Sequence, residues 1–324
     1  MDIRPIQNLL APALEDTRSL MARTLHSDIP LLEGMNADLQ GNAGKLLRPM
    51  LTLLVADACG GITEDSIRFA AASALMHNAS LLHDDVVDAA PERRGRTTVQ
   101  AKLGPTASVL LGDYWLTGCI RCILDASAHA HRVVRLFAKT LADLTEGEWL
   151  QLEKAEKADT TQEDYLRIIY SKTASLFEAS ASAGAISAGA PEEVIAAVGA
   201  FARDMGIAFQ IEDDRFDYGG APALGKPVGV DLREGKITQP LLCALEAAPA
   251  EELRIRALVK RIPSDPCAEE AVRAFVRQQD GLGRAAAVRD SYIGKALQEL
   301  EALPPSRGKD FLAELARYVG DRNC

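Results

Sequence analysis

The sequence predicts an all-α fold, a single bundle of long antiparallel helices around a central cavity. Long stretches of the chain lack both Gly and Pro, the residues that most often end helices. Ala, Leu and Met dominate these stretches, whereas β-branched residues do not cluster in alternating runs. No repeat with a period of roughly 20–50 residues and no low-complexity linker divides the sequence. We therefore expect one domain that spans residues 1–324.

The longest of these stretches covers residues 62–90, which is 29 residues without Gly or Pro. As a helix it would be about 43 Å long. Gly60 and Gly61 precede it, and Pro91 and Gly95 follow it. The other predicted helices are separated by similar Gly and Pro clusters and cover residues 107–116, 133–154, 163–182, 191–217 and 236–247, with more in the last third of the chain.

Composition and charge exclude several classes of protein. The chain has 324 residues, a hydrophobic fraction of 48% and a formal net charge of −10. This composition favours a globular protein over a disordered or fibrous one. The negative charge argues against a nucleic-acid partner. An acidic protein that handles phosphates must concentrate its positive charge locally or use metal ions.

The sequence predicts a cytoplasmic protein without an integral membrane segment. No run of about 18 or more uncharged apolar residues occurs. Residues 1–14 include Asp2 and Arg4 and lack the apolar core of a signal peptide. The six cysteines are too few and too scattered for a disulfide framework. Cys119 and Cys122 form a lone CxxC pair, which we expect to be two buried thiols.

The first acidic motif, Asp84-Asp85-Val86-Val87-Asp88, ends the longest predicted helix. On a helix, Asp84 and Asp88 lie four residues apart, so their carboxylates share one face. Mg²⁺ is typically bound by one or two protein carboxylates, with water and substrate phosphate in its other positions. A solvated acidic helix end would look similar, but negative charge near a helix C-terminus is unfavourable.

A second motif repeats this spacing 129 residues later, as Asp213-Asp214-Arg215-Phe216-Asp217. It again ends a predicted helix, just before Gly219 and Gly220. Two such motifs that face each other could hold several Mg²⁺ ions around one diphosphate and neutralise the charge that develops on it. The pair is therefore much more specific than either motif alone.

Basic residues follow both motifs or lie in loops defined by Gly and Pro. Lys and Arg at such positions are suited to hold phosphate oxygens. They are numerous enough for two diphosphates. The residues are Lys45, Arg48, Arg93, Arg94, Lys172, Lys226 and Lys236.

At this point the sequence resembles the trans-polyprenyl diphosphate synthase family, in particular long-chain all-trans members such as octaprenyl diphosphate synthases. The resemblance extends over nearly the whole chain. Its segments are Gly44–Pro49, His77–Gly95, Gly147–Leu152, Lys172–Thr173, Gly206–Pro240 and Leu315–Val319. It implies the all-α isoprenoid-synthase fold, Mg²⁺ dependence with three ions per site, and condensation of isopentenyl diphosphate with an allylic diphosphate such as farnesyl or geranyl diphosphate. The long-chain product would serve as a quinone side chain.

The resemblance also assigns roles by position. The metal ligands would be Asp84, Asp85, Asp88, Asp213, Asp214 and Asp217, with Lys172 beside the reacting bond. The allylic diphosphate would contact Arg93, Lys172, Thr173, Gln210, Lys226 and Lys236. Isopentenyl diphosphate would contact Lys45, Arg48, His77 and Arg94. His83 also matches the family, and we expect it to orient the aspartate side chains.

Small side chains on the helix that ends at Asp84 predict a long product. Ser80, Ala79, Met76 and Ala72 form one stripe down this helix, along the path of a growing chain. Short-chain relatives often place Phe or Tyr in the stripe as a floor. Met76 is the bulky member, and its flexible side chain can move aside.

The family pairs through long helices, so the resemblance also implies a homodimer. An apolar stretch that could form the interface contains Val109, Leu110, Leu111, Trp115, Leu116 and Ile120. The same stretch could equally be a core helix. The only membrane contact expected is a transient one for product release.

Four alternatives remain open. A short-chain (geranylgeranyl or farnesyl) diphosphate synthase shares both acidic motifs. A class I terpene synthase would not need the second set of cations, Lys45, Arg48, His77 and Arg94. A metal phosphohydrolase that used His83-Asp84 would need further His ligands, and the chain has only five His. A silent partner subunit of a heteromeric synthase would typically lack one or both acidic motifs.

Overall fold

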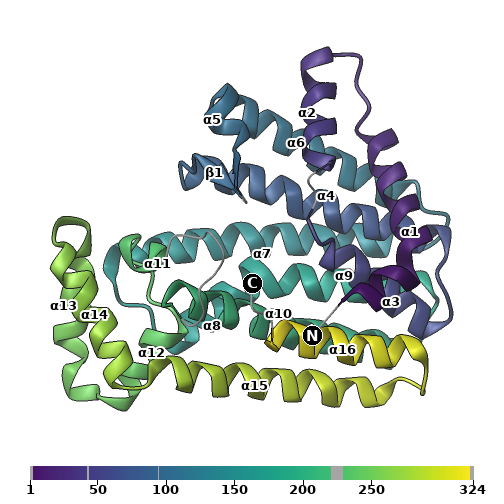
Figure 1. Ribbon diagram of the computed structural model, residues 1–324. Coiled ribbons are helices and arrows are strands. Elements are labelled where there is room, and N and C mark those ends of the chain that lie inside the picture. Colours follow the sequence, from purple (N-terminus) through teal and green to yellow (C-terminus); the bar gives the residue numbers. More distant parts are fainter. Residues whose placement is uncertain (1–2, 42–43, 94, 220–228, 322–324) are drawn as a thin grey trace.

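The computed structural model describes residues 3–41, 44–93, 95–219 and 229–321 and confirms the all-α prediction (Figure 1). The first helices are α1 (Arg4–Thr24), α2 (Pro30–Gln40), α3 (Leu47–Cys59), α4 (Glu64–Val87), α5 (Val99–Leu103), α6 (Pro105–Leu124), α7 (Ala130–Lys157) and α8 (Gln162–Ile169). The others are α9 (Ser175–Ser187), α10 (Glu192–Asp217), α11 (Val230–Arg233), α12 (Gln239–Ala247), α13 (Glu252–Arg261), α14 (Pro266–Gln278), α15 (Gly281–Glu299) and α16 (Arg307–Asp321). Short 3₁₀ turns are η2 (Pro249–Glu251), η3 (Ile262–Ser264) and η4 (Leu300–Ala302).

The helix predicted over residues 62–90 is α4, and both of its ends have a local cause. At its start, the Thr63 hydroxyl accepts a hydrogen bond from the backbone N–H of Ser66, and the Ser66 hydroxyl accepts one from the N–H of Thr63. This reciprocal capping satisfies two backbone donors that the first turn would otherwise leave unpaired. At the other end, Ala89 takes a left-handed conformation with φ 47°, which stops the helix just after Asp88.

Two features of the backbone differ from the sequence-based expectation. A two-residue ladder pairs β1 (Glu92–Arg93) with β2 (Arg96–Thr97), and it folds the segment after α4 back on itself. The helix predicted over residues 163–182 is interrupted by a π-helical turn, η1 (Tyr170–Ala174), between α8 and α9. Such turns are rare and often mark functional sites.

The buried side chains form two clusters that share two long helices. The first cluster lies mainly between α1, α3, α4, α6, α9 and α16, and the second between α8, α12, α13 and α14. In α10, Phe201 belongs to the first cluster and Ile211 to the second. In α15, Ala285 belongs to the second and Ala296 to the first. The single-domain expectation stays a prediction, and these two shared helices favour it.

The two cysteines of the CxxC pair, Cys119 and Cys122, are buried free thiols in α6, as expected. Two of the described helices, α6 and α10, are long and apolar enough to cross a membrane by length and composition alone. In α10 67% of the apolar window is buried inside the protein, and in α6 the share is 44%. A core helix passes the same test, so burial accounts for α10. The exposed apolar side chains of α6 are considered below with the oligomeric state.

A close helix crossing predicts a strongly destabilising substitution. A Cβ added at Gly184 of α9 would lie 2.3 Å from the backbone oxygen of Thr52 in α3, closer than atoms can approach. We therefore expect Gly184→Ala to lower the free energy of unfolding by about 1–3 kcal/mol, through overpacking of the crossing. Denaturant unfolding measures this change. Gly34→Ala in α2 is the control, because nothing lies within 4 Å of its added Cβ. It should be neutral or stabilising, and equal effects of the two substitutions would contradict the packing argument.

Candidate active site

The three aspartates at the end of α4 lie in different environments. Asp85 is only 5% exposed and accepts a hydrogen bond of 2.6 Å from Nε of Arg93 in β1. The short β-ladder thus brings Arg93 back onto the helix. Asp84 is half-buried and Asp88 is exposed. Arg93 pairs with Asp85, whereas the carboxylates of Asp84 and Asp88 lie one helical turn apart on the same helix.

The groups that shift the pKa of Asp84 identify the neighbours of the first acidic cluster. Burial raises the pKa of Asp84 to about 6, and the carboxylates of Glu148 and Asp88 add to this increase. The ammonium group of Lys172 opposes it, followed by Arg93. Lys172 in turn forms an ion pair with Glu148 of α7. The first acidic cluster therefore faces the π-helical turn that carries Lys172.

In the second cluster, Asp214 is held by a chain of hydrogen bonds. Its side chain is 3% exposed and accepts hydrogen bonds from the Tyr165 hydroxyl, at 2.6 Å, and from Nε2 of Gln210, at 2.9 Å. The Thr173 hydroxyl donates to Oε1 of Gln210 at 2.8 Å. Burial raises the pKa of Asp214 well above its usual range. Of the residues predicted to contact substrate, Gln210 thus binds a predicted metal ligand directly, and Thr173 is linked to it through Gln210.

Asp217 fixes the start of the short helix α11 against the end of α10. Its carboxylate accepts hydrogen bonds from the backbone N–H groups of Val230, at 2.9 Å, and Asp231, at 3.2 Å. These are the first residues of the short helix α11. Burial raises the pKa of Asp217 despite these donors. Asp217 therefore has a structural role in addition to the one predicted for it.

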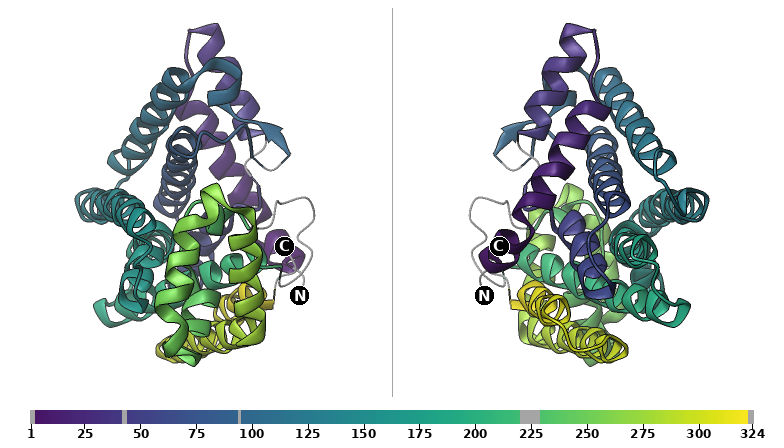
Figure 2. Two further views of the ribbon diagram at one scale, coloured as in Figure 1. Left: turned by 90° about the vertical axis from the view of Figure 1, so that its left-hand side faces the viewer. Right: turned by 90° about the vertical axis from the view of Figure 1, so that its right-hand side faces the viewer.

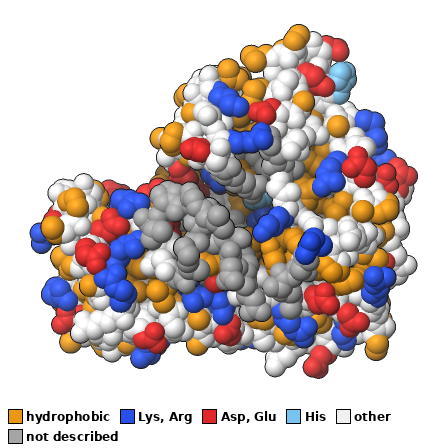
Figure 3. Space-filling view, in the orientation of Figure 1, with side chains coloured by type: hydrophobic (Ala, Val, Ile, Leu, Met, Phe, Trp, Pro, Cys, Tyr) orange, Lys and Arg blue, Asp and Glu red, His pale blue; other side chains and the backbone are white. Residues whose placement is uncertain are grey.

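Two lysines lie between the clusters. Burial and the neighbouring Asp217 raise the pKa of Asp231. The positive charge of Lys172 opposes this increase, as it opposes the increase in the pKa of Asp84. Burial lowers the pKa of Lys236, but the carboxylates of Glu234, Asp231 and Asp88 together raise it above its usual value. Each lysine thus interacts with one carboxylate at the end of α4 and with Asp231 of α11, whose backbone N–H donates to Asp217. Basic side chains also line the edge of a recess between the upper and lower helices (Figure 3).

Two glycines explain how η1 fits between its neighbours. A Cβ at Gly147 of α7 would lie 2.6 Å from Cβ of Ser171, and one at Gly206 of α10 would lie 2.7 Å from Cα of Ala174. The π-helical turn is therefore packed on both sides against bare backbone. Lys172 and Thr173 lie in this turn, so their positions are set by α7 and α10 together.

A second group of cations is supported by aromatic rings. Nζ of Lys45 donates a hydrogen bond of 2.7 Å to the Tyr318 hydroxyl and lies 5.5 Å from the centre of its ring. The guanidinium of Arg48 lies 4.5 Å from the ring centre of Phe177 in α9. The face of the Phe177 ring attracts the Arg48 guanidinium without neutralising it. The Tyr318 hydroxyl is neutral, so accepting a hydrogen bond from Lys45 does not cancel the charge of this lysine.

The carboxylate side chains fit a divalent cation. Their oxygens are the ligands that Mg²⁺ prefers, and burial raises the pKa values of Asp84, Asp214 and Asp217, so a bound cation would stabilise their charged forms. In the part of the chain that the structure describes, no three His, Cys, Asp or Glu side chains are grouped closely enough to hold an ion alone.

The structure contradicts one of the expected roles, because His83 does not orient the aspartates. Its Nε2 lies 3.2 Å from Oδ1 of Asp113 and 3.3 Å from the carbonyl oxygen of Val109, both on α6. The ring packs over Gly112, where a Cβ would be only 2.3 Å away. The expectation for His83 is therefore wrong, since α6 occupies that face of α4. Arg94 and Lys226 lie outside the described residues.

Sequence reasoning missed several residues that support the site: Glu148, Tyr165, Phe177, Asp231 and Tyr318. Tyr165 precedes Lys172 by seven residues, or two helical turns, and this spacing could have suggested it. Glu148 and Tyr318 lie in segments that carry the family resemblance. Nothing in the sequence pairs Phe177 with Arg48.

The raised pKa of Asp84 predicts how it affects stability. A carboxyl group whose pKa is higher in the folded protein stabilises the fold below its unfolded pKa, and this contribution is lost as the pH rises through about 6. Asn cannot ionise. We therefore expect Asp84→Asn to be more stable than the unchanged protein at pH 8, by about 1–3 kcal/mol, and to lose this advantage near pH 4.

Denaturant unfolding in the presence of a chelator at both pH values measures this difference. Asp28→Asn is the control, because the Asp28 side chain is fully exposed. An Asp84→Asn variant that is less stable than the unchanged protein at pH 8 would contradict the electrostatic argument.

Comparison with known proteins agrees with this geometry. The Polyprenyl synthetase family matches residues 29–277. The octaprenyl diphosphate synthase of Haemophilus influenzae is 37% identical over 325 residues, which cover 100% of this chain and 98% of the relative. A decaprenyl diphosphate synthase from Rhodobacter capsulatus is 35% identical, with a TM-score of 0.92 over 99% of both chains.

A second solved structure is a polyprenyl synthase from Caulobacter crescentus complexed with calcium and isoprenyl diphosphate. It is 31% identical, with a TM-score of 0.91, and the match covers 100% of this chain and 98% of the other. The matches to the relative and to the two solved structures cover 99–100% of this chain, from Lys45 and Arg48 to the helix that carries Tyr318. The protein therefore belongs to the polyprenyl synthetase family.

Proposed function

We propose that this protein is a Mg²⁺-dependent trans-prenyltransferase that condenses isopentenyl diphosphate with an allylic diphosphate to form a long-chain all-trans polyprenyl diphosphate. The main support is the presence of two separate groups of cations. Lys172 and Lys236 lie between the acidic clusters, and Lys45 and Arg48 lie on aromatic rings elsewhere. Two such groups suit two diphosphates. The expected use of the product is as a quinone side chain.

Each group would bind one substrate. Arg93, Lys172, Thr173, Gln210 and Lys236 would hold the allylic diphosphate. Lys45, Arg48 and His77 would hold isopentenyl diphosphate, and His77 lies two turns before Asp84 on α4, so the substrates would be neighbours. Arg94 and Lys226 are assigned by resemblance to the isopentenyl and allylic groups. When bound by the six aspartates, Mg²⁺, three ions per site, would neutralise the charge of the departing diphosphate.

The protein's own task is positioning and the exclusion of water. The allylic C–O bond breaks, and the electrons of the isopentenyl double bond form the new C–C bond. A proton then leaves the adjacent carbon and is accepted by the released pyrophosphate. No side-chain nucleophile is required. Lys172 keeps positive charge beside the departing group, because the two glycines that pack against η1 fix its position.

A purified-protein assay tests the function. With radiolabelled isopentenyl diphosphate, farnesyl diphosphate and Mg²⁺, we expect an elongated lipid product, and a chelator should abolish it. Asp84→Ala and Asp213→Ala should each lower kcat by about a thousandfold or more, because a lost metal ligand costs several kcal/mol of transition-state stabilisation. Asp28→Ala is the control. Absence of Mg²⁺-dependent elongation, or activity within tenfold in either site variant, would refute the proposal.

The small side chains of α4 support a long product. Ala72 and Ala79 are fully buried and Met76 is 3% exposed, whereas Ser80 is half-buried. The Ser80 hydroxyl donates only to the carbonyl of His77 in its own helix, at 2.9 Å. If the stripe lines the path of the growing chain, a larger side chain at residue 80 would narrow this path, and replacing Ser80 removes only this hydrogen bond within α4.

We expect Ser80→Phe to shorten the products while the first condensation keeps its rate, as measured by chain-length chromatography. Asn78→Phe is the matched control, because residue 78 points about 160° away around α4. Ala79→Phe should also shorten the product, but residue 79 is buried, so its stability must be checked. Products of unchanged protein that stop at farnesyl or geranylgeranyl length would show that the floor lies elsewhere.

We also propose a homodimer in the cytoplasm, with only transient membrane contact for product release. On α6, Leu110 is 64% exposed and Ile120 is 48% exposed, and on the adjacent α7 Trp149 is 70% exposed. The two helices lie on the same side of the molecule (Figure 2). Two other residues of the predicted interface, Leu111 and Trp115, face the core instead. Leu116 is half-buried against the first buried cluster, which leaves Val109, Leu110 and Ile120 for the interface.

Light scattering at micromolar concentration should give about twice the chain mass of 34.8 kDa. Leu110→Asp should produce monomers, because it buries a charge in an apolar interface. Leu253→Asp on α13 is the control. Leu253 is 87% exposed, and α13 packs in the second buried cluster, whereas α6 packs in the first. A monomeric mass for the unchanged protein would disprove the dimer.

A further inference from the structure

The tip of Lys45 is held by a residue from the other end of the chain. Nζ of Lys45 lies 2.7 Å from the hydroxyl oxygen of Tyr318 and 5.5 Å from the centre of its ring. Lys45 is exposed, whereas Tyr318 is only 9% exposed. An exposed lysine normally samples many rotamers, and binding an anion must then restrict it at a cost in entropy. Here the rigid, buried tyrosine already restricts it.

The packing of α16 on α3 explains why Tyr318 reaches this position. Near the start of α16, a Cβ at Gly308 would lie 2.9 Å from the backbone nitrogen of Ala58, so the two helices touch there. Ten residues further along α16 is Tyr318, and ten residues back along α3 is Arg48. Because helices rise equally per residue, antiparallel packing brings Tyr318 beside the start of α3. The buried side chains of Leu312, Leu315, Ala316 and Val319 hold α16 in place.

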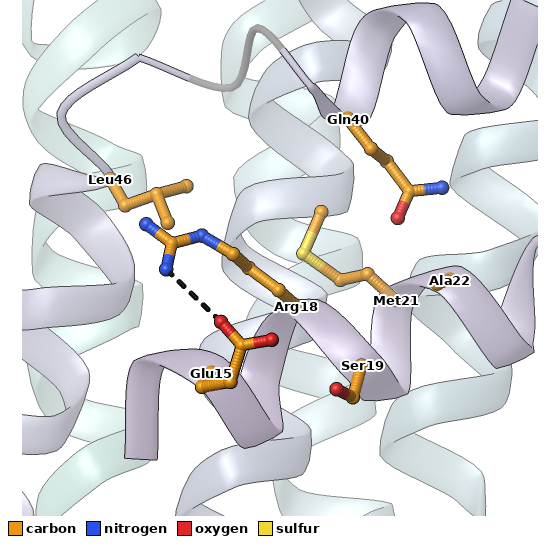
Figure 4. Close-up of a pocket in the computed structure, with 7 residues that line it drawn as sticks. All are labelled: Glu15, Arg18, Ser19, Met21, Ala22, Gln40 and Leu46. Atoms are coloured by element: carbon orange, nitrogen blue, oxygen red, sulfur yellow. Dashed lines mark ion pairs between the residues drawn. The ribbon is translucent and has the colours of Figure 1, made fainter. Parts of the chain in front are cut away.

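The backbone end of Lys45 is also fixed. The next residue, Leu46, takes a left-handed conformation with φ 51°, which is strained for a side chain of this type. Its side chain is 7% exposed and points toward Arg18 and Met21 of α1, beside a pocket of about 250 Å³ (Figure 4). Lys45 is therefore held at its base by a buried neighbour and at its tip by Tyr318.

The chemistry of the contact leaves the ammonium group able to bind. An ammonium has three N–H donors, and Tyr318 uses one of them. The tyrosine oxygen accepts this hydrogen bond and is neutral, so the positive charge is oriented and not cancelled, in contrast to Lys172, which pairs with Glu148. Two donors of Lys45 remain for an anion. We propose that Tyr318 is a positioning residue that holds Lys45 ready for the diphosphate of isopentenyl diphosphate; this inference rests on the proposed function.

Steady-state kinetics of Tyr318→Phe test the inference. Phe keeps the ring but removes the hydrogen bond. We expect KM for isopentenyl diphosphate to rise roughly three- to tenfold, the range typical of one lost hydrogen bond, while kcat and KM for the allylic substrate change less than about twofold. Tyr292→Phe is the matched control, because the ammonium of Lys295 lies 4.5 Å from the Tyr292 ring in a similar contact on α15.

A double-mutant cycle separates positioning from a general structural role. If Tyr318 acts through Lys45, Tyr318→Phe should raise KM little further once Lys45→Gln is present. Thermal unfolding of each variant, together with calorimetric titration of isopentenyl diphosphate, shows whether the fold or the binding site has changed. Additive effects in the cycle, or an unchanged KM in Tyr318→Phe, would overturn the inference.

The same variants distinguish this inference from the proposed function. If Lys45→Gln raises KM for isopentenyl diphosphate but Tyr318→Phe does not, the function stands and the positioning role is wrong. If Lys45→Gln leaves that KM unchanged, Lys45 does not bind this substrate, and the positioning role falls with that assignment. If the unchanged protein does not elongate any allylic diphosphate, the proposed function itself fails.

Discussion

The site depends on the crowding of carboxylates at the ends of α4 and α10. These side chains are removed from water without enough positive charge to balance them, and this raises the pKa values of Asp84, Asp214 and Asp217. The fold tolerates the cost because the long helices are anchored elsewhere by apolar packing. A site that is short of positive charge attracts cations, and cations are what a diphosphate also needs. Because the buried carboxylates are destabilised in the protein alone, binding of cations relieves this cost and is therefore favoured.

The two groups of basic residues are supported in different ways. Lys172 has a carboxylate partner in Glu148, which an anionic substrate would have to replace or share. Lys45 donates to the neutral Tyr318 hydroxyl, and the Arg48 guanidinium lies against the Phe177 ring. Neither of these partners carries a charge, which suits a group that must hold an anion by its own charge. Lys172 instead has the carboxylates of Asp84 and Asp231 nearby.

The parts of the site that could be predicted from sequence are those set by local spacing. The carboxylates of Asp84 and Asp88 share a helix face because they are four residues apart, and both acidic motifs do end helices. The basic residues were recognised from their positions after the acidic motifs and in Gly- and Pro-defined loops, and the family resemblance assigned each of them to a substrate. The packing of the His83 side chain against α6 could not be predicted, because it depends on the space that Gly112 leaves for the ring. The π-helical turn likewise depends on glycines in two other helices.

The supporting residues escaped prediction for the same reason. Tyr165 and Asp214 are 49 residues apart, and Lys45 and Tyr318 are 273 apart. Helical periodicity gives no information on such pairs, because they form only when α8 packs on α10 and α16 on α3. The helix prediction was accurate over α4 and α10, where Gly and Pro clusters mark the ends. No Gly or Pro marks the ends of α7, which extends three residues beyond its predicted range at each end, and α6 continues to Leu124, eight residues past its predicted end. The break at η1 was also missed.

The continuity of α10 has a consequence for folding. This helix passes from one buried cluster to the other and carries Asp213, Asp214 and Asp217 at its end, while Gly206 in its middle packs against η1. If either cluster unfolded, half of α10 would lose its packing, and the remaining half would be too short to hold its helical form alone. We therefore expect both clusters to unfold cooperatively, with similar amide-exchange protection along the helix. Partly folded chains would then not display the acidic site, and only the complete molecule would bind its ligands.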